Sequence, residues 1–141
     1  MATQTPESQS ARPDRSRLMV FMFTDVADST RLKQPGAIGA AEYAKLSRLH
    51  DQVVRDIVGS YAGAEVLKDV GDGFMAVFET ASDAVKAGVR SQHRILSDPA
   101  FTPPGSGSGF RIRIGLNQGE VSVLDLDING KPKLIGPAAD L

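Results

Sequence analysis

Two aspartates in this chain lie where acidic side chains could hold a metal ion, each beside apolar runs that have the pattern of strands. Asp25 follows the apolar residues 18–23, and Asp72 lies between the apolar segments 66–70 and 74–78. Two carboxylates with few other protein ligands suit Mg²⁺ or Mn²⁺, which keep bound waters and share oxygens with phosphate groups. For Asp72 alone, a solvated carboxylate in a tight turn is the alternative. The second carboxylate favours the metal site.

The residues that follow the first carboxylate predict a place for phosphate. They offer good N-cap chemistry, and a short helix is expected from Arg31 to a Pro-Gly pair at 35–36. Backbone amides at a helix N-terminus favour phosphate oxygens. The candidate substrate-binding residues are Ala27, Asp28, Ser29 and Thr30. Two metal ions, a triphosphate and an aligned hydroxyl are together the components of phosphoryl or nucleotidyl transfer.

The hydrophobic pattern around these residues predicts alternating strands and helices. Residues 18–23 suit a strand buried on both faces, and Asp72-Gly73 is predicted to be the tight turn of a hairpin over residues 65–78. The remaining predicted elements are a helix over 38–58, a helix capped near Thr80 and ending near 96, a strand over 110–116, a turn at 117–119, a strand over 120–124 and a turn at 129–130. This order is the βαββαβ pattern of an α+β ferredoxin-like domain, with helices on one face of a largely antiparallel sheet.

Three further interpretations concern single side chains and a loop. On the second long helix, Ala84, Val85 and Val89 are predicted to face inward. His50 and His93 are interpreted as surface histidines rather than ligands. Residues 97–109, rich in Gly, Pro and Ser, lack the Gly-Lys-Ser/Thr ending of a P-loop and are predicted to form a flexible linker.

Composition restricts the classes of protein to which the chain can belong. The 141 residues suit one domain, and 41% hydrophobic with 23% charged residues is an ordinary globular composition. The net charge of −1 gives no reason to expect nucleic acid or a membrane surface as a partner, and the absence of cysteine excludes thiolate metal sites. Without a membrane-spanning segment or a secretory signal, the chain is expected to be cytoplasmic. Residues 1–16 are predicted to be a disordered tail.

Three segments of the sequence resemble motifs of the catalytic domain of the class III adenylate and guanylate cyclases, and they occur in the same order as in that family. They are residues 20–30 (VFMFTDVADST), 68–74 (KDVGDGF) and 111–121 (RIRIGLNQGEV), and residues 136–141 (GPAADL) resemble the beginning of that family's next motif. The resemblance implies that residues 17–141 are a ferredoxin-like nucleotide cyclase domain without its C-terminal part.

The resemblance also implies roles for single residues. Asp25 and Asp72 match the two metal-binding aspartates, with Val26 beside them at the metal site, for two Mg²⁺ or Mn²⁺ ions. Lys68 matches a base-recognition lysine of adenylate cyclases. The implied reaction converts a nucleoside triphosphate, ATP by resemblance, to a 3′,5′-cyclic nucleotide and pyrophosphate. One metal ion would activate the ribose 3′-hydroxyl and the other would hold the triphosphate, at a site built from both protomers of a homodimer.

Several positions depart from the family pattern. Asp140 is the catalytic candidate of the last segment, but the family has a ribose-binding asparagine there, and an aspartate adds negative charge near a triphosphate. The transition-state arginine would fall three residues beyond the last one. Lys133 stands where adenylate cyclases usually carry an aspartate that accepts from the adenine amine, and lysine only donates, which suits a carbonyl of guanine or uracil. In a shifted register Asp125 or Asp127 is the acceptor. Asp28 replaces a common glycine.

Four functional interpretations follow. The first is a nucleotide cyclase in cyclic-nucleotide signalling, and the 141-residue chain alone is then expected to be weakly active or inactive. The second is a catalytically impaired domain that binds nucleotide or a regulatory partner, indicated by Asp140. The third is a pyrimidine (cyclic UMP or CMP) cyclase of a bacterial defence system, indicated by Lys133. The last is an unrelated ferredoxin-like module, which the combined motifs disfavour. The presence of both candidate metal ligands, Asp25 and Asp72, favours the first interpretation, an active nucleotide cyclase.

Overall fold

The computed structural model describes residues 16–70, 73–126 and 132–135, which form one sheet with helices. The elements in order are β1 (Ser16–Val26), α2 (Ser29–Leu32), α3 (Ala40–Val58), β2 (Glu65–Val70), β3 (Gly73–Phe78), α4 (Ala81–Ser97), the 3-10 helix η1 (Pro99–Phe101), β4 (Ile112–Leu126) and β5 (Pro132–Ile135). The predicted tail 1–16 lies outside the described residues except for Ser16, which begins β1.

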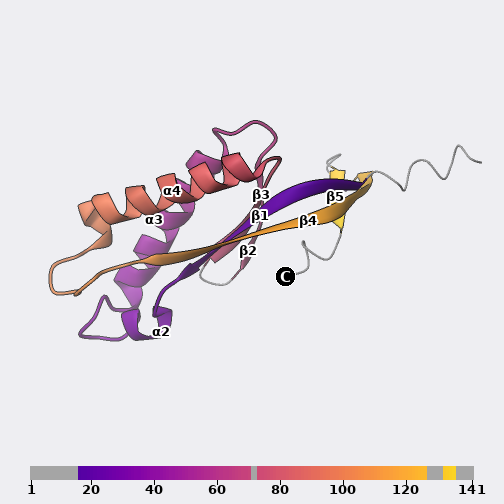
Figure 1. The fold of residues 1–141 in the computed structure, drawn as a ribbon. Helices are drawn as coiled ribbons and strands as arrows, with labels where there is room; N and C mark the ends of the chain where they lie inside the picture. The colour runs from indigo at the N-terminus through magenta and orange to yellow at the C-terminus, as the bar shows by residue number, and fades with distance from the viewer. Residues whose placement is uncertain (1–15, 71–72, 127–131, 136–141) are drawn as a thin grey trace, which may run out of the picture.

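The sheet has the strand order β2-β3-β1-β4-β5, and every neighbouring pair is antiparallel. The first four strands in this order are the arrangement of a ferredoxin-like βαββαβ domain, so the predicted fold class is confirmed. Figure 1 shows α3 and α4 on one side of the twisted sheet, while β1 and β4 extend past them toward β5. The fold therefore leaves the other side of the sheet without a described helix.

The first strand is longer than predicted and carries its buried residues on both faces. Val20 and Met22 pack with the helices, whereas Met19 and Phe21 join a second cluster with Met75, Val77 and Val121. Successive strand residues point to opposite faces, so this second cluster lies on the side away from α3 and α4. The continuous apolar run is thus explained by burial on two sides, as predicted.

β4 is one continuous strand, and the turn predicted at residues 117–119 is wrong. Its pairing with β1 runs from Val26–Ile112 to Ser16–Ser122 without a register shift. Asn117 lies opposite Phe21 and Gly119 opposite Met19. The turn propensity of this segment is overridden because its backbone pairs with β1 throughout.

The β2–β3 hairpin is confirmed. Gly73, which was predicted to belong to the turn, begins β3 and pairs with Val70, whereas Asp72 lies outside the described residues. The register shifts between Val66 and Lys68, which marks a β-bulge in β2.

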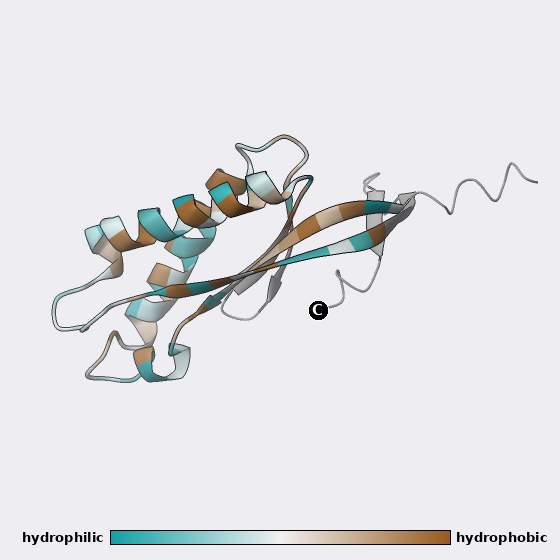
Figure 2. Cartoon of the chain, viewed as in Figure 1, coloured by the Kyte–Doolittle hydropathy of each residue, from teal (hydrophilic) through white to brown (hydrophobic). Residues whose placement is uncertain are grey.

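α4 packs on the sheet through small side chains. Its inward side is made by Ala84, Ala87, Gly88, Ser91 and Ile95. Val85 and Val89 are 49% and 63% exposed, so the prediction that they face inward is wrong. An added Cβ at Gly88 would lie 3.7 Å from Ile114, which shows how closely the helix approaches β4. Figure 2 shows the resulting alternation of hydrophobic and hydrophilic residues along α4.

The loop between α4 and β4 is packed rather than a flexible linker. Phe101 is fully buried, with its ring centroid 5.6 Å from that of Phe110. The Phe110 amide donates to the Phe101 carbonyl at 2.7 Å. Gly109 has φ +79°, and a Cβ there would lie 2.5 Å from the same carbonyl oxygen. Buried aromatic residues therefore fix a segment that its composition predicted to be mobile.

His50 on α3 is a core residue, not the surface histidine that was predicted. Its side chain is fully buried, and its ring centroid lies 6.0 Å from that of Phe110. Nδ1 lies 3.0 Å from Oδ1 of Asp51. Burial lowers the pKa of His50 below its usual value, while the hydrogen bond and the charge of Asp51 oppose this shift. His93 is exposed, as predicted.

Within the described part of the chain, no helix combines the length and the apolar character that crossing a membrane requires.

Candidate active site

The candidate site begins with an ion pair at the end of β1. Asp25 is the penultimate residue of β1 and lies directly opposite Arg113 on β4. Nη2 of Arg113 donates to Oδ2 of Asp25 at 2.7 Å, and the two side chains are 69% and 59% exposed. Asp25 shares its side of the sheet with Phe23 and Phe21, because strand residues alternate. An exposed pair contributes about 1 kcal/mol at most, so this carboxylate is readily released to another cation.

The loop that follows β1 turns through an unusual backbone conformation. The Ala27 amide donates to the Arg111 carbonyl at 2.8 Å, so it is already occupied within the fold. Asp28 occupies the N-cap position of α2 with φ 56°, but its side chain makes no capping hydrogen bond. Its carboxylate instead lies 3.8 Å from Nη2 of Arg31. The first amides of α2 have no partner within the helix, as at every helix start.

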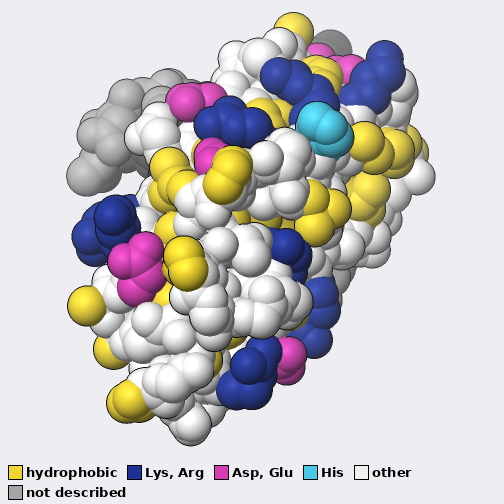
Figure 3. Space-filling model, turned by 90° about the vertical axis from the view of Figure 1, so that its left-hand side faces the viewer, with side chains coloured by type: hydrophobic (Ala, Val, Ile, Leu, Met, Phe, Trp, Pro, Cys, Tyr) yellow, Lys and Arg dark blue, Asp and Glu magenta, His cyan; other side chains and the backbone are white. Residues whose placement is uncertain are grey.

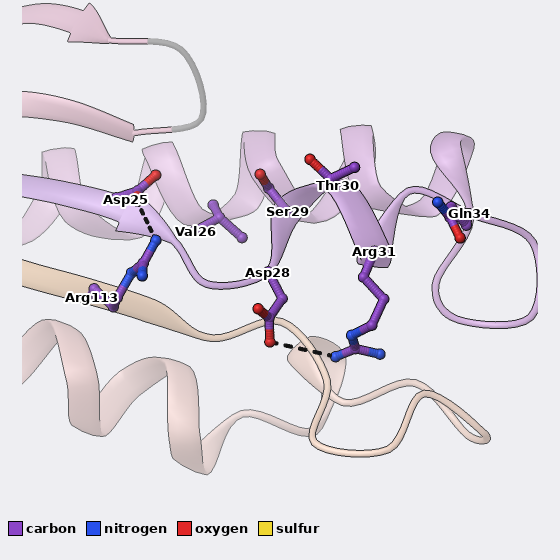
Figure 4. Close-up of a pocket in the computed structure, with 8 residues that line it drawn as sticks. All are labelled: Asp25, Val26, Asp28, Ser29, Thr30, Arg31, Gln34 and Arg113. Carbon is purple, nitrogen blue, oxygen red and sulfur yellow. Dashed lines mark hydrogen bonds and ion pairs between the residues drawn. The ribbon is translucent and has the colours of Figure 1, made fainter.

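These elements surround an open cavity of about 510 Å³. Its lining consists of Asp25, Val26, Asp28, Ser29, Thr30, Arg31, Gln34 and Arg113. Figure 4 shows that these side chains come from the end of β1, the loop with α2, and β4. The volume is within the usual range for small-ligand sites, roughly 300–1,000 Å³. The lining offers carboxylates, hydroxyls and guanidinium groups, the groups that bind a metal–phosphate complex.

Charges in the cavity balance locally. Two aspartates and two arginines line it, so their formal charges cancel. On the face drawn in Figure 3, Lys and Arg side chains are intermixed with Asp and Glu instead of forming a continuous stripe. That face therefore lacks the clustered basic side chains that mark a nucleic-acid-binding surface.

The sequence matches the family described as "Adenylate and Guanylate cyclase catalytic domain" over residues 13–130. The chain belongs to this family. The match covers most of the chain and confirms the family inferred from the three motifs. Among curated proteins, none matches this cyclase domain.

Solved cyclase structures share the fold of this domain. A bacterial light-regulated adenylyl cyclase gives a TM-score of 0.69 at 20% identity over 89% of this chain and 38% of its own. An adenylate/guanylate cyclase/hydrolase from Silicibacter pomeroyi gives 0.64 at 24% identity over 89% of this chain and 66% of its own. The guanylyl cyclase Cya2 gives 0.65 at 19% identity over 89% and 66%. The cyclase chain thus spans 38% to 66% of these chains, and identities this low show the fold alone.

The structure brings together part of the predicted site. The cavity is lined by Asp25, Val26, Asp28, Ser29 and Thr30, while Ala27 is outside its lining. Asp72 and Asp140 lie outside the described residues. Because Phe23 pairs with Met75, β3 begins at the same end of the sheet as Asp25. In the same row of the sheet, Lys68 of β2 pairs with Met75.

The predicted base-recognition residue Lys133 belongs to the other end of the sheet. It lies in β5, which pairs with β4 residues 122–126. Arg113, opposite Asp25, is about ten residues away along β4, roughly 30 Å at the rise of a strand. Figure 1 shows β5 and α2 at opposite ends of the molecule. One protomer therefore does not bring Lys133 and Asp25 into one site.

Three residues of the cavity were missed by sequence reasoning, namely Arg31, Gln34 and Arg113. Arg113 lies within the strand that was predicted over residues 110–116, where its side chain was assigned no role. The missing information was the register that places it opposite Asp25. The signal that could have identified Arg113 is a basic residue placed opposite the candidate metal ligand Asp25 on the neighbouring strand.

The donor set suits a hard divalent cation that is completed by its substrate. Mg²⁺ is usually held by one or two carboxylates together with substrate phosphates, and Asp25 offers an exposed carboxylate in the cavity. In the described ranges, no group of three or more His, Cys, Asp or Glu side chains is arranged to hold a metal. A metal ion here would therefore need oxygens from a phosphate group and from residues beyond these ranges.

Proposed function

We propose that this domain is the catalytic domain of a nucleotide cyclase that converts a nucleoside triphosphate to a 3′,5′-cyclic nucleotide and pyrophosphate. In this reaction the ribose 3′-oxygen loses its proton and bonds to the α-phosphorus, and the bond to the pyrophosphate oxygen breaks. The single observation that carries the proposal is the cavity in which Asp25, the start of α2 and Arg113 meet. It combines an exposed carboxylate, which can bind a divalent metal ion, with guanidinium groups, which can bind phosphate, in a chain of the cyclase family.

Asp25, Val26 and Asp72 are the residues proposed to hold two Mg²⁺ or Mn²⁺ ions. Bound ions of this kind supply Lewis acidity to the 3′-hydroxyl and neutralise charge on the phosphates. The pairing of β1 with β3 supports Asp72 as the second ligand, because β3 begins with Gly73 at the end of the sheet where Asp25 lies. Release of Asp25 from its exposed ion pair would make its carboxylate available.

Arg113 is proposed to bind phosphate oxygens once Asp25 is engaged elsewhere. A guanidinium presents parallel N–H donors that match a phosphate. The hydroxyls of Ser29 and Thr30, which line the same cavity, are further donors. The Ala27 amide is withdrawn from the predicted set because it donates to Arg111.

The active site is proposed to form between two copies of the domain. Lys133 and Asp140 were assigned to base and ribose recognition, yet β5 lies at the opposite end of the sheet from Asp25. A two-fold arrangement would allow β5 of one protomer to face the Asp25 end of its partner. Lys68, on β2, would serve base recognition from the first protomer. A homodimer is expected in sedimentation analysis of the nucleotide-bound protein.

ATP is the proposed substrate by resemblance, in the cytoplasm where nucleoside triphosphates are held.

One specific observation favours a second candidate function. Asp140 replaces a ribose-binding asparagine, and its charge would repel a triphosphate. The second candidate is therefore a domain that binds nucleotide without turnover. Lys133 favours a base with a carbonyl, as in guanine or uracil.

The test measures binding and turnover of all four ribonucleoside triphosphates with Mn²⁺. We expect at least one to bind and to give cyclic product, at a low rate in the 141-residue chain. Asp25→Asn is expected to abolish both cyclic product and Mn²⁺-dependent binding, because it removes a ligand charge at nearly constant shape. Asp56→Asn is the matched control, since Asp56 is an exposed α3 carboxylate outside the cavity that accepts from Gln52 at 2.9 Å. Binding without product supports the second candidate. Unchanged binding and turnover in Asp25→Asn would refute the metal assignment.

A further inference from the structure

The cavity contains a second guanidinium that the proposed reaction has not used. Arg31 comes from α2, whereas Arg113 comes from β4, and both line the cavity. Figure 4 shows each arginine turned toward a carboxylate of the β1–α2 segment, Arg113 toward Asp25 and Arg31 toward Asp28. The chain therefore pairs both of its cavity cations with its own anions.

The pair between Arg31 and Asp28 is loose. The two groups are 3.8 Å apart, and their side chains are 57% and 72% exposed. Exposed pairs with spacing i,i+3 stabilise a helix only slightly. A phosphate can take both N–H donors of the guanidinium fork and carries more charge than a carboxylate. An entering triphosphate would therefore compete successfully for Arg31.

Asp28 is not needed for the backbone of this loop. Its φ of 56° lies in the left-handed region, where glycine is free of strain and asparagine is well tolerated. The aspartate makes no capping hydrogen bond. What it adds is a negative charge in a cavity proposed for an anion, and this charge faces Arg31.

We propose that Arg31 is a second phosphate-binding residue and that Asp28 is its internal competitor. Without nucleotide, the Asp28 carboxylate holds Arg31; when the triphosphate chain enters, Arg31 moves from Asp28 to phosphate oxygens. The pair then lowers affinity for short anions and favours ligands with several phosphates. This inference rests on the proposed function, because it takes the cavity as the triphosphate site.

The test uses inorganic triphosphate with Mn²⁺ as a probe that is independent of the base, with phosphate and pyrophosphate for comparison. Dissociation constants are measured by calorimetry on the 141-residue chain and its variants. Arg31→Gln is expected to weaken triphosphate binding by about 10- to 100-fold, the range for one charge-assisted contact. Arg31→Lys is expected to be intermediate. Asp28→Asn, which tolerates the same backbone, is expected to tighten binding by about fivefold.

Arg17→Gln is the control. Arg17 is also an exposed, ion-paired arginine, 3.3 Å from Glu79, but lies at the other end of β1. It is expected to leave triphosphate affinity unchanged.

Each outcome decides the inference. If Arg31→Gln binds triphosphate as tightly as the unsubstituted chain, Arg31 is not a phosphate ligand, and the proposed function stands on its own test. Weaker or equal binding by Asp28→Asn refutes the competitor role. If the unsubstituted chain binds neither triphosphate nor any nucleotide, both the inference and the proposed function fail. The inference is supported if Arg31→Gln loses more affinity for triphosphate than for phosphate, and if Asp28→Asn gains affinity for triphosphate.

Discussion

Replacing Arg113 by glutamine should change Mn²⁺ affinity and nucleotide affinity in opposite directions. Arg113 donates to Asp25 at 2.7 Å and so competes with any metal ion for that carboxylate. With nucleotide bound, Arg113 is proposed to hold phosphate instead. The substitution removes a competitor from the first equilibrium and a ligand from the second.

The magnitudes follow from the exposure of the pair. With side chains 69% and 59% exposed, the ion pair contributes about 0.2–1 kcal/mol after solvent screening, so Mn²⁺ alone should bind up to about fivefold more tightly to Arg113→Gln. Loss of a charge-assisted phosphate contact is worth about 1.5–3 kcal/mol, so the Mn²⁺–nucleotide complex should bind about 10- to 100-fold more weakly. Unfolding stability should change by less than about 1 kcal/mol.

Free Mn²⁺ measured by electron paramagnetic resonance gives the first constant, and calorimetry with the nucleotide gives the second. Arg17→Gln, which breaks the exposed pair with Glu79, is expected to change neither. The reasoning would be refuted if Arg113→Gln bound Mn²⁺ alone more weakly, or if both affinities moved in the same direction.

Two further predictions concern the scaffold. Gly109→Ala should lower the free energy of unfolding by about 3 kcal/mol, because the added Cβ would lie 2.5 Å from the Phe101 carbonyl oxygen. The control is Gly105→Ala, where φ is +82° but the surrounding space is open, and it should lower the free energy of unfolding by only about 1 kcal/mol. Urea titration measures both. His50 has a lowered pKa in the folded state, so its stabilising contribution is full above its unfolded pKa of about 6.5 and is lost as the pH falls below it. Between pH 7.5 and 5.5, His50→Leu should therefore lose less free energy of unfolding than the unsubstituted protein, with a difference of at most about 1.4 kcal/mol per pH unit. An equal loss in the two proteins would contradict this prediction.

Sequence patterns were sufficient where one local signal agreed with one structure. The hairpin of β2 and β3, the N-cap in which Thr80 accepts from the Asp83 amide at 3.1 Å, and the doubly buried β1 were all predicted from short segments. In each, hydrophobic period, turn chemistry and capping indicate the same element. The fold class followed from their order.

The errors have a common cause, because each depends on a partner distant in the sequence. Residues 117–119 form no turn because β1 pairs with them, and Val85 is exposed because α4 packs on the sheet through Ala84, Ala87 and Gly88. His50 is buried because Phe110, from a loop predicted to be a linker, packs against it. Arg113 became part of the site only through a cross-strand register. Local propensity carries no information about such partners.

The uninterrupted pairing of β1 with β4 also restricts how this chain can vary in length. The β2–β3 and β4–β5 pairs each contain a register shift, whereas β1 and β4 run from Ser16–Ser122 to Val26–Ile112 without one. A single inserted or deleted residue in β4 between Arg113 and Val121 would exchange the two faces of everything on one side of it. Either the guanidinium would leave Asp25 for the helix-covered side, or Val121 would leave the second cluster. Insertions in the connecting loops carry no such consequence, so changes in length should be excluded from this strand and concentrated in the loops.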